Sequence, residues 1–94
     1  MFDMMGKLQE MQQKMEESKK RLDAIQVTGE SADGKIKVSA TGNRRITAVS
    51  IDDSLLSGDK EELEDLLIVA LNRALENAEN TWNSEMQGVA GGMF

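Results

Sequence analysis

The first quarter of the chain carries apolar residues at alternating intervals of three and four positions. This seam consists of Met4, Leu8, Met11, Met15, Leu22 and Ile25, with Ser18 at the one polar position. Such a repeat averages about 3.5 residues and is typical of helices that pair along their length. The pattern predicts a helix over residues 1–26 that contacts another helix. Pairing with a dimer mate, packing on the chain's own sheet and free projection all remain open.

Residues 27–51 change to the patterns of β-strands. A β-branched start predicts a first strand over residues 27–32, and Asp33-Gly34 indicates a hairpin because glycine accepts the positive φ of such turns. Residues 35–41 then alternate polar and apolar side chains with period two. Gly42-Asn43 marks the next turn.

The third predicted strand, residues 46–51, changes phase along its length. Ile46 and Ala48 fall on one parity, whereas Val49 and Ile51 fall on the other. A bulge near Ala48 would explain the change, and so would burial of both faces at a dimer contact. Short connections between the strands favour an antiparallel meander.

A second helix is predicted over residues 59–87. Asp59 is placed to cap its start, and acidic residues crowd its first turn, where the helix dipole favours them. Its apolar stripe, which we expect to cover the sheet, is Leu63, Leu67, Ala70, Leu71, Ala74, Leu75, Ala78 and Trp82. The glycine-rich residues 88–94 are expected to form a flexible tail.

These elements predict one α+β domain over residues 1–94, a helix, a three-stranded antiparallel meander and a helix. A chain of 94 residues with no cysteine and three aromatic residues (two Phe, one Trp) has few means of stabilising itself alone. Association is the remaining means, and the seam favours the same conclusion. We therefore expect a homodimer.

Charge is distributed unevenly along the chain. The formal net charge is −6, yet residues 1–51 carry nine bases and seven acids, whereas residues 52–94 carry two bases and ten acids. On the first helix, bases at heptad position g line one side of the seam and acids occupy positions b and c. Two interpretations of the basic residues at position g are open. In the first, they solubilise the helix or pair with acids of its partner. In the second, they form a row of positive charge that binds a polyanion.

The candidate DNA-binding residues are the bases of the first half: Lys7, Lys14, Lys19, Lys20, Arg21, Lys35, Lys37, Arg44 and Arg45. The Arg44-Arg45 pair on a turn is suited to bidentate contacts with phosphates, although it could equally pair with acids of the second helix. No aromatic residue is interleaved with these bases in the sequence, so a nucleic acid would be held through its backbone. Trp82 is interpreted as a packing residue.

Catalysis and cofactor binding find little support in the composition. The chain has no histidine and no cysteine, which removes the commonest general base, the thiol nucleophile and the softer metal ligands. Asp52-Asp53 are interpreted as solvated loop acids, so we expect no metal, no cofactor and no small-molecule substrate. The longest apolar run is Leu66–Leu71, too short for a membrane span, and no secretory signal is evident at the start.

Several short motifs together resemble the YbaB/EbfC family of bacterial nucleoid-associated proteins. They are Val27-Thr28-Gly29-Glu30-Ser31, Gly34 with Val38, Arg44-Arg45, Ile51-Asp52-Asp53-Ser54-Leu55-Leu56, Asp59-Lys60-Glu61 and Leu63-Glu64-Asp65-Leu66. The Met- and Gln-rich start and the Gly-Met-Phe ending are also similar to the family. The resemblance covers nearly the whole chain and keeps the order of its elements.

The resemblance implies a cytoplasmic, nucleoid-associated homodimer with a central sheet body and projecting helices. It implies binding of double-stranded DNA with low sequence preference, changes in DNA conformation and an influence on gene expression. Arg44-Arg45 is the closest match to the family pattern among the candidate site residues. The alternative hypothesis is a protein-interaction module that uses the seam, alone or together with the Gly-Met-Phe ending, without binding DNA.

Overall fold

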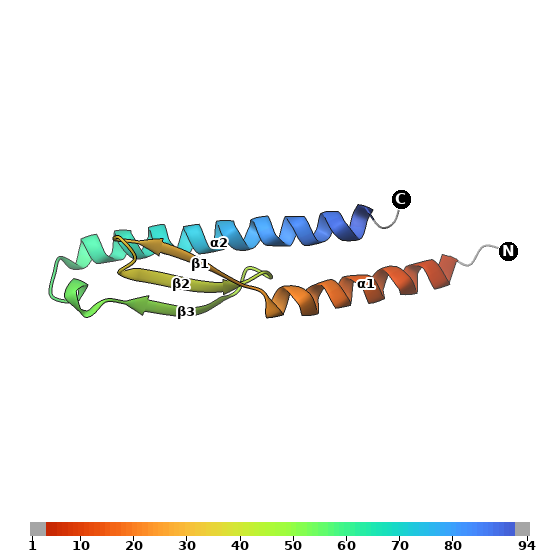
Figure 1. Ribbon diagram of the computed structural model, residues 1–94, viewed down its shortest axis with the longest axis horizontal. Helices are drawn as coiled ribbons and strands as arrows, with labels where there is room; N and C mark the ends of the chain where they lie inside the picture. Colours follow the sequence, from red (N-terminus) through yellow and green to blue (C-terminus); the bar gives the residue numbers. More distant parts are fainter. Residues whose placement is uncertain (1–3, 92–94) are drawn as a thin grey trace.

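The computed structural model describes residues 4–91 and confirms the predicted order of elements (Figure 1). The elements are α1 (Met4–Ala24), β1 (Gln26–Ser31), β2 (Ile36–Thr41), β3 (Ile46–Ile51), the short 3₁₀ helix η1 (Asp53–Leu55) and α2 (Lys60–Gly91). The strands form one antiparallel sheet in the order β1-β2-β3, which is the predicted meander. The molecule is elongated, with extents of 70 × 18 × 17 Å.

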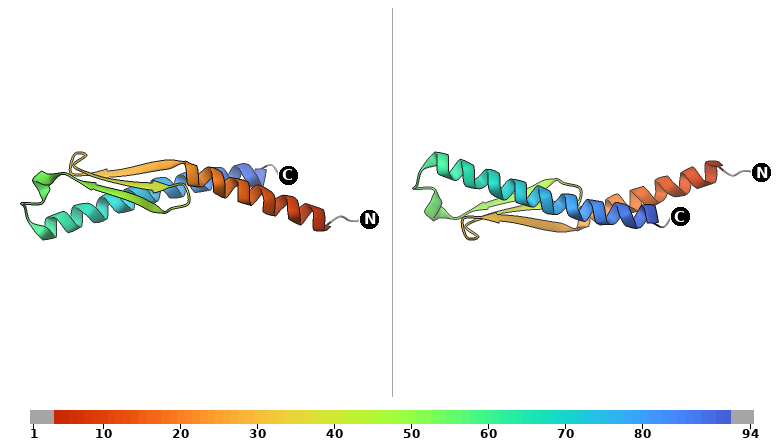
Figure 2. Two further views of the ribbon diagram at one scale, coloured as in Figure 1. Left: turned by 90° about the horizontal axis from the view of Figure 1, so that it is seen from below. Right: turned by 90° about the horizontal axis from the view of Figure 1, so that it is seen from above.

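Helix α2 lies along the sheet and covers β1 and β2 (Figures 1 and 2). The core between these layers is built from Ile36, Val38, Ala40, Ala70, Ala74 and Ala78. The alanines let the helix backbone approach β1 so closely that a Cβ on Gly29 would lie 2.2 Å from the Ala74 nitrogen. A glycine on β1 and a row of small residues on α2 therefore set the distance between helix and sheet.

Polar side chains tie β1 to α2 at the outer edge of the sheet. Arg73 Nη1 donates to the Glu30 carbonyl at 2.7 Å, and Asn77 Nδ2 donates to the Thr28 carbonyl at 2.7 Å. Ser31 Oγ donates to the Leu66 carbonyl at 2.6 Å. The bonds from Arg73 and Asn77 occupy two backbone carbonyl groups of β1, so this edge is protected from pairing with another strand.

The phase change in the third strand is a β-bulge. Ser39 pairs with Ala48 while Ala40 pairs with Ile46, which leaves Thr47 as the extra residue. Val49 is opposite Val38 and Ile46 is opposite Ala40, both of which belong to the core. The bulge therefore places Ile46 and Val49 on the same face of the sheet as the core. The expectation of a bulge near Ala48 is confirmed.

The apolar face of β3 is not covered in the single chain. Val49 is 46% exposed and Ile46 is 37% exposed, because α2 lies over the two other strands. The alternative, burial of both faces at a dimer contact, depends on a second copy and stays a prediction.

The seam of α1 is buried only at its C-terminal end. Ser18 and Leu22 are buried where α1 meets the rest of the molecule, and Ile25 is half-buried. The N-terminal part of α1 projects beyond the sheet, as Figure 1 shows, and its seam residues there are exposed. These exposed residues are Met4, Leu8, Met11 and Met15.

Strand β1 covers residues 26–31 where 27–32 were expected, and β2 begins at Ile36 where residue 35 was expected. Two helix ends also differ from the sequence-based expectation. Helix α1 ends at Ala24 rather than residue 26, because β1 already begins at Gln26. Helix α2 continues to Gly91, so a flexible tail beginning at residue 88 was wrong for residues 88–91. The rest of the predicted tail lies outside the described residues. At its start α2 is capped as expected, since Asp59 Oδ1 accepts the Glu61 N–H at 3.0 Å.

Candidate nucleic-acid interface

The turn between β2 and β3 is fixed against the end of α1. Gly42 N–H donates to the Leu22 carbonyl at 3.0 Å and to the Ile25 carbonyl at 3.1 Å. Asn43 Nδ2 donates to the Lys19 carbonyl at 3.0 Å and to the carboxylate of Asp23. The turn therefore has a fixed position relative to the helix that carries most of the candidate bases.

An open groove lies where α1, this turn and α2 meet, and we call it the neck groove. It is lined by Lys19, Asp23, Asn43, Arg44, Arg45 and Trp82. The guanidinium carbon of Arg44 lies 4.9 Å from the centre of the Trp82 ring, which is a cation–π contact. Three of the predicted DNA-binding bases thus converge here, from α1 and from the turn.

Arg21 is bound within the protein. Its Nε donates to Glu85 Oε1 at 2.7 Å, and its Nη2 donates to the buried Ser18 Oγ at 3.0 Å. The hydrogen bond from Arg21 lowers the pKa of the Glu85 carboxyl below its ordinary value of 4.5, although partial desolvation opposes this effect. Arg21 therefore connects α1 to α2 and is less available to an outside anion than the other bases of α1.

Protonation of Glu85 should weaken this connection between the helices. Because its folded pKa is lowered, the stabilisation is complete above the ordinary value and is lost as the pH falls through the lower folded value. We expect Glu85→Gln to lower the melting temperature at pH 7 and to have a smaller effect near pH 3, as measured by circular dichroism. Glu79→Gln, which changes an exposed acid on the same helix, is the control. A Glu85→Gln deficit that persists unchanged in acid would contradict this assignment.

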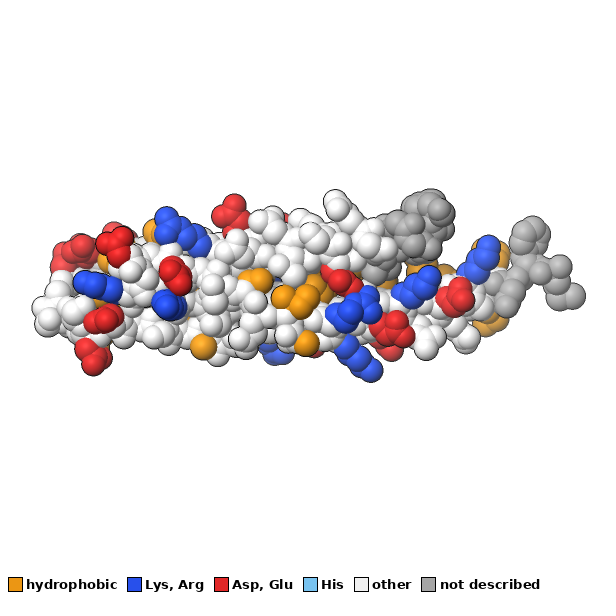
Figure 3. All heavy atoms as spheres, viewed as in Figure 1, with side chains coloured by type: hydrophobic (Ala, Val, Ile, Leu, Met, Phe, Trp, Pro, Cys, Tyr) orange, Lys and Arg blue, Asp and Glu red, His pale blue; other side chains and the backbone are white. Residues whose placement is uncertain are grey.

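Other bases of α1 are exposed and make no salt bridge within residues 4–88. They are Lys7, Lys14 and Lys20, which we call the α1 lysines. Lys19 and the two arginines of the turn are likewise without a carboxylate partner in this part of the chain. Figure 3 shows basic side chains spaced along the projecting helix, with acidic side chains between them. The predicted sorting into a basic and an acidic edge is therefore less sharp on this face than the heptad pattern suggested.

Lys35 and Lys37 lie elsewhere, near the β1–β2 turn at the opposite end of the sheet. Lys37 Nζ is 3.9 Å from Glu30 Oε1. Lys35 is one cause of the lowered pKa of Asp52, although the hydrogen bond from the Ser54 backbone N–H contributes most. The structure thus does not bring these two lysines together with the bases of α1 and the turn.

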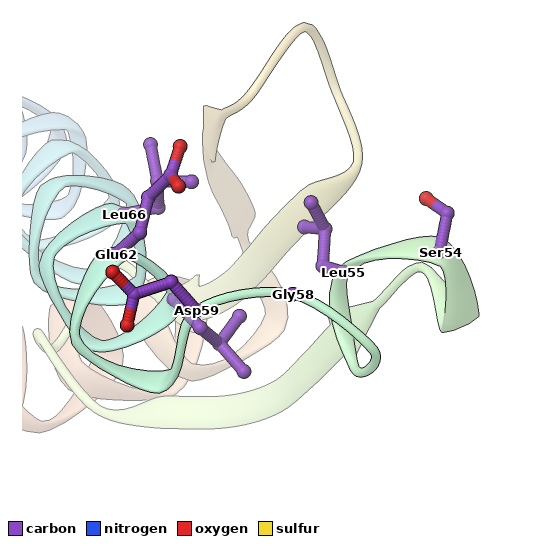
Figure 4. Close-up of a pocket in the computed structure, with 7 residues that line it drawn as sticks. Ser54, Leu55, Gly58, Asp59, Glu62 and Leu66 are labelled. Atoms are coloured by element: carbon purple, nitrogen blue, oxygen red, sulfur yellow. The ribbon is translucent and has the colours of Figure 1, made fainter.

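The described residues offer little for metal or small-molecule chemistry. Residues 4–91 contain no group of three or more His, Cys, Asp or Glu side chains that could hold a metal ion. A small pocket between η1 and the start of α2 is lined by Ser54, Leu55, Gly58, Asp59, Glu62, Leu63 and Leu66 (Figure 4). No helix in this part of the chain combines the length and apolar character that crossing a bilayer requires.

Comparison with known proteins identifies the family. Residues 1–93 match the YbaB/EbfC DNA-binding family. The chain belongs to this family. It is 50% identical over 90 residues to a nucleoid-associated protein of Flavobacterium johnsoniae, an alignment that covers 96% of this chain and 84% of the relative. The fold is similar to the crystal structure of an uncharacterized protein from Helicobacter pylori, with a TM-score of 0.80, 27% identity and coverage of 99% and 98% of the two chains.

In this member of the YbaB/EbfC family, the sequence did not indicate that Trp82 contacts Arg44. The residue is separated from Arg44 by the whole of β3 and much of α2, so no spacing pattern connects the two. They meet because α2 runs back along the sheet toward the end of α1 (Figure 2). The only signal in the sequence was a tryptophan at the end of an apolar stripe that otherwise consists of leucine and alanine.

Proposed function

We propose that this protein is a homodimeric nucleoid-associated protein that binds double-stranded DNA through its backbone with low sequence preference. The observation that carries the proposal is a set of lysines and arginines on α1 and at the neck groove that have no salt-bridge partner within residues 4–88. The chain that carries them belongs to a DNA-binding family. DNA bound in this way would change conformation and influence gene expression in the cytoplasm.

The spacing of the α1 lysines suits a polyanion. Helix α1 has 21 residues and is therefore about 30 Å long. Lys7 and Lys14 lie on one side of it, about 10 Å apart along its axis, whereas Lys20 lies roughly 140° around the helix from Lys7. Lysine is a flexible point charge, and duplex DNA carries one charge per about 1.7 Å of its axis. Such side chains neutralise phosphates without reading base edges, which supports low sequence preference.

The negative net charge does not oppose this proposal, because the acids lie mainly elsewhere. The first turns of α2 carry Glu61, Glu62, Glu64 and Asp65, at the opposite end of the molecule from projecting α1. At physiological salt, dissolved ions largely screen the interaction between charges that are more than about 8 Å apart. A duplex beside α1 would therefore experience the acids of α2 only weakly. The acids that compete with the basic residues are those of α1 itself, Glu10, Glu16, Glu17 and Asp23, so binding needs the basic side chains to approach the phosphates more closely than these acids do.

Binding should be tested with labelled duplexes of equal length and unrelated sequence. Fluorescence anisotropy at 50 mM salt is expected to give dissociation constants that agree within about threefold, since phosphate contacts carry no sequence information. Preference for one duplex by a hundredfold or more would contradict backbone recognition. Absence of binding to both duplexes would contradict the proposed function itself.

The homodimer is supported by the uncovered face and the open edge of β3. Ile46 and Val49 lie on the core face of the sheet yet are exposed, and no side chain of α2 blocks the outer edge of β3 as it does that of β1. A second copy packed on this strand would bury apolar surface that one chain leaves in water.

Val49→Glu is expected to convert the dimer to single chains, because it places a charge on the face that the second copy would cover. Ser50→Glu, the neighbouring change on the opposite face, is expected to leave the dimer intact. Sedimentation equilibrium measures both. A wild-type protein that sediments as one chain would contradict the dimer.

A second candidate function rests on the exposed part of the seam. Met4, Leu8, Met11 and Met15 leave an apolar stripe that could accept a helix of another protein. Recovery of a stoichiometric protein partner after nuclease treatment, by a protein with no DNA affinity, would favour this protein-interaction module over DNA binding.

A further inference from the structure

We propose that Arg44, held against Trp82 in the neck groove, is a fixed binding point for one DNA phosphate, and that Trp82 is its positioning residue. This inference rests on the proposed function and adds a division of roles to it. The neck groove would fix where the backbone sits, whereas the α1 lysines would supply attraction along the duplex without a defined geometry.

The backbone at Arg44 is the first argument. Arg44 has a φ of +63°, a left-handed conformation in which glycine or asparagine is favoured. Asn43 precedes it and Gly42 is nearby, but the turn places the arginine at this position. Ala32 and Asp33 in the β1–β2 turn share this left-handed backbone, so the conformation by itself does not mark a site. Its consequence at Arg44 is that the guanidinium is directed toward Trp82 on α2.

The contact with Trp82 is the second argument. The guanidinium lies over the ring face, so the aromatic surface restricts the arginine side chain and leaves the N–H groups at its edge available. An arginine restricted in this way loses less conformational entropy when it binds, and its planar fork matches two phosphate oxygens. Lysines on the exposed face of α1 have neither property.

The other residues of the neck groove fit an anionic ligand. Lys19 and Arg45 add positive charge beside Arg44, and both are exposed and without a carboxylate partner among the described residues. The one acid in the lining, Asp23, accepts a hydrogen bond from Asn43 and holds the turn. The ligand class that suits three cations in an open groove is a phosphodiester of a backbone passing across it.

Arg44→Lys separates geometry from charge. It keeps the positive charge but removes the bidentate fork and most of the stacking on Trp82. We expect a loss of DNA affinity of about tenfold at 0.1 M salt, with little change in the slope of log K against log salt. Lys14→Gln is the contrasting variant, since loss of a point charge is expected to reduce that slope by about one.

Arg44→Gly tests the proposal without risk to folding. Glycine suits the left-handed backbone, so the variant is expected to melt at the wild-type temperature or above while binding DNA more weakly than Arg44→Lys. Trp82→Leu keeps a half-buried apolar side chain at this position of α2 but removes the aromatic face, and it is expected to weaken binding as Arg44→Lys does. Trp82 is the only tryptophan, and the chain has no tyrosine, so its emission reports directly on the neck groove.

Saturation of the wild-type protein with unlabelled duplex is expected to change Trp82 emission, and Arg44→Gly should abolish that change. If the wild type binds DNA while Arg44→Lys, Arg44→Gly and Trp82→Leu bind equally well and the emission does not change, the neck groove is not a binding point and the proposed function still stands. If the wild type binds no duplex at all, the proposed function fails and this inference fails with it.

Discussion

Replacing the α1 lysines together, as Lys7→Gln, Lys14→Gln and Lys20→Gln in one chain, is expected to lower DNA affinity on the order of 10²-fold at 0.1 M salt. Each neutralised phosphate contributes a slope of about −0.9 to log K against log salt, which corresponds to roughly eightfold at this concentration. These lysines are exposed and make no salt bridge within residues 4–88, so their loss should leave the fold intact. Anisotropy titration with a labelled duplex measures the effect.

The matched control changes the same number of charges at the other end of the molecule. Lys35 and Lys37 lie near the β1–β2 turn, and Lys60 begins α2. Replacing these three by glutamine alters net charge identically but is expected to change affinity by less than about threefold at the same salt. Equal losses in the two variants would mean that net charge matters and position does not, which would remove α1 from the mechanism.

Gly29→Ala is expected to destabilise the folded protein by about 3 kcal/mol or more, or to prevent folding. The added Cβ would lie 2.2 Å from the Ala74 nitrogen and 2.4 Å from the Ala70 carbonyl oxygen. Both are backbone atoms of α2, so no side chain can move aside to make room. The helix would have to leave the sheet, which would also lengthen the bonds from Arg73 and Asn77 to β1.

Chemical denaturation followed by circular dichroism measures this change in the free energy of unfolding. Gly88→Ala is the control, since a Cβ there would have no neighbour within 4 Å and alanine favours helix by up to about 1 kcal/mol. A Gly29→Ala protein as stable as wild type would mean that helix and sheet are farther apart in solution than this structure places them.

Much of the fold could be predicted from the sequence because local signals agreed with the final structure. Asp59 caps α2, and the period-two pattern of residues 35–41 matches the buried positions of β2. The parity change in the third strand led to the bulge, since a phase change within a strand has few physical causes. Each of these signals acts over a few residues.

The end of α2 was not predictable in this way. The glycines at 88 and 91 indicated a break, yet the helix includes both. Helix propensity is a weak preference of about 1 kcal/mol per glycine, and the long preceding helix supplies a template that propagates through it. Local composition was therefore a poor guide to where this helix stops.

The candidate site depended on contacts between residues far apart in the chain. The heptad pattern placed Arg21 with the other bases, but its pairing with Glu85, 64 residues away, required the position of α2. The neck groove likewise needs α1, the β2–β3 turn and α2 in place at once. The sequence identified which residues are basic, whereas packing determined which of them have a salt-bridge partner within the chain.

The most direct test of the central claim is the salt dependence of duplex binding by the unmodified protein. The account predicts a linear fall of log K with log salt between 50 and 200 mM, with a slope of about −4 or steeper, because several exposed bases replace counterions on the phosphates. A slope near zero, or no binding at 50 mM salt, would contradict recognition of the DNA backbone by these bases.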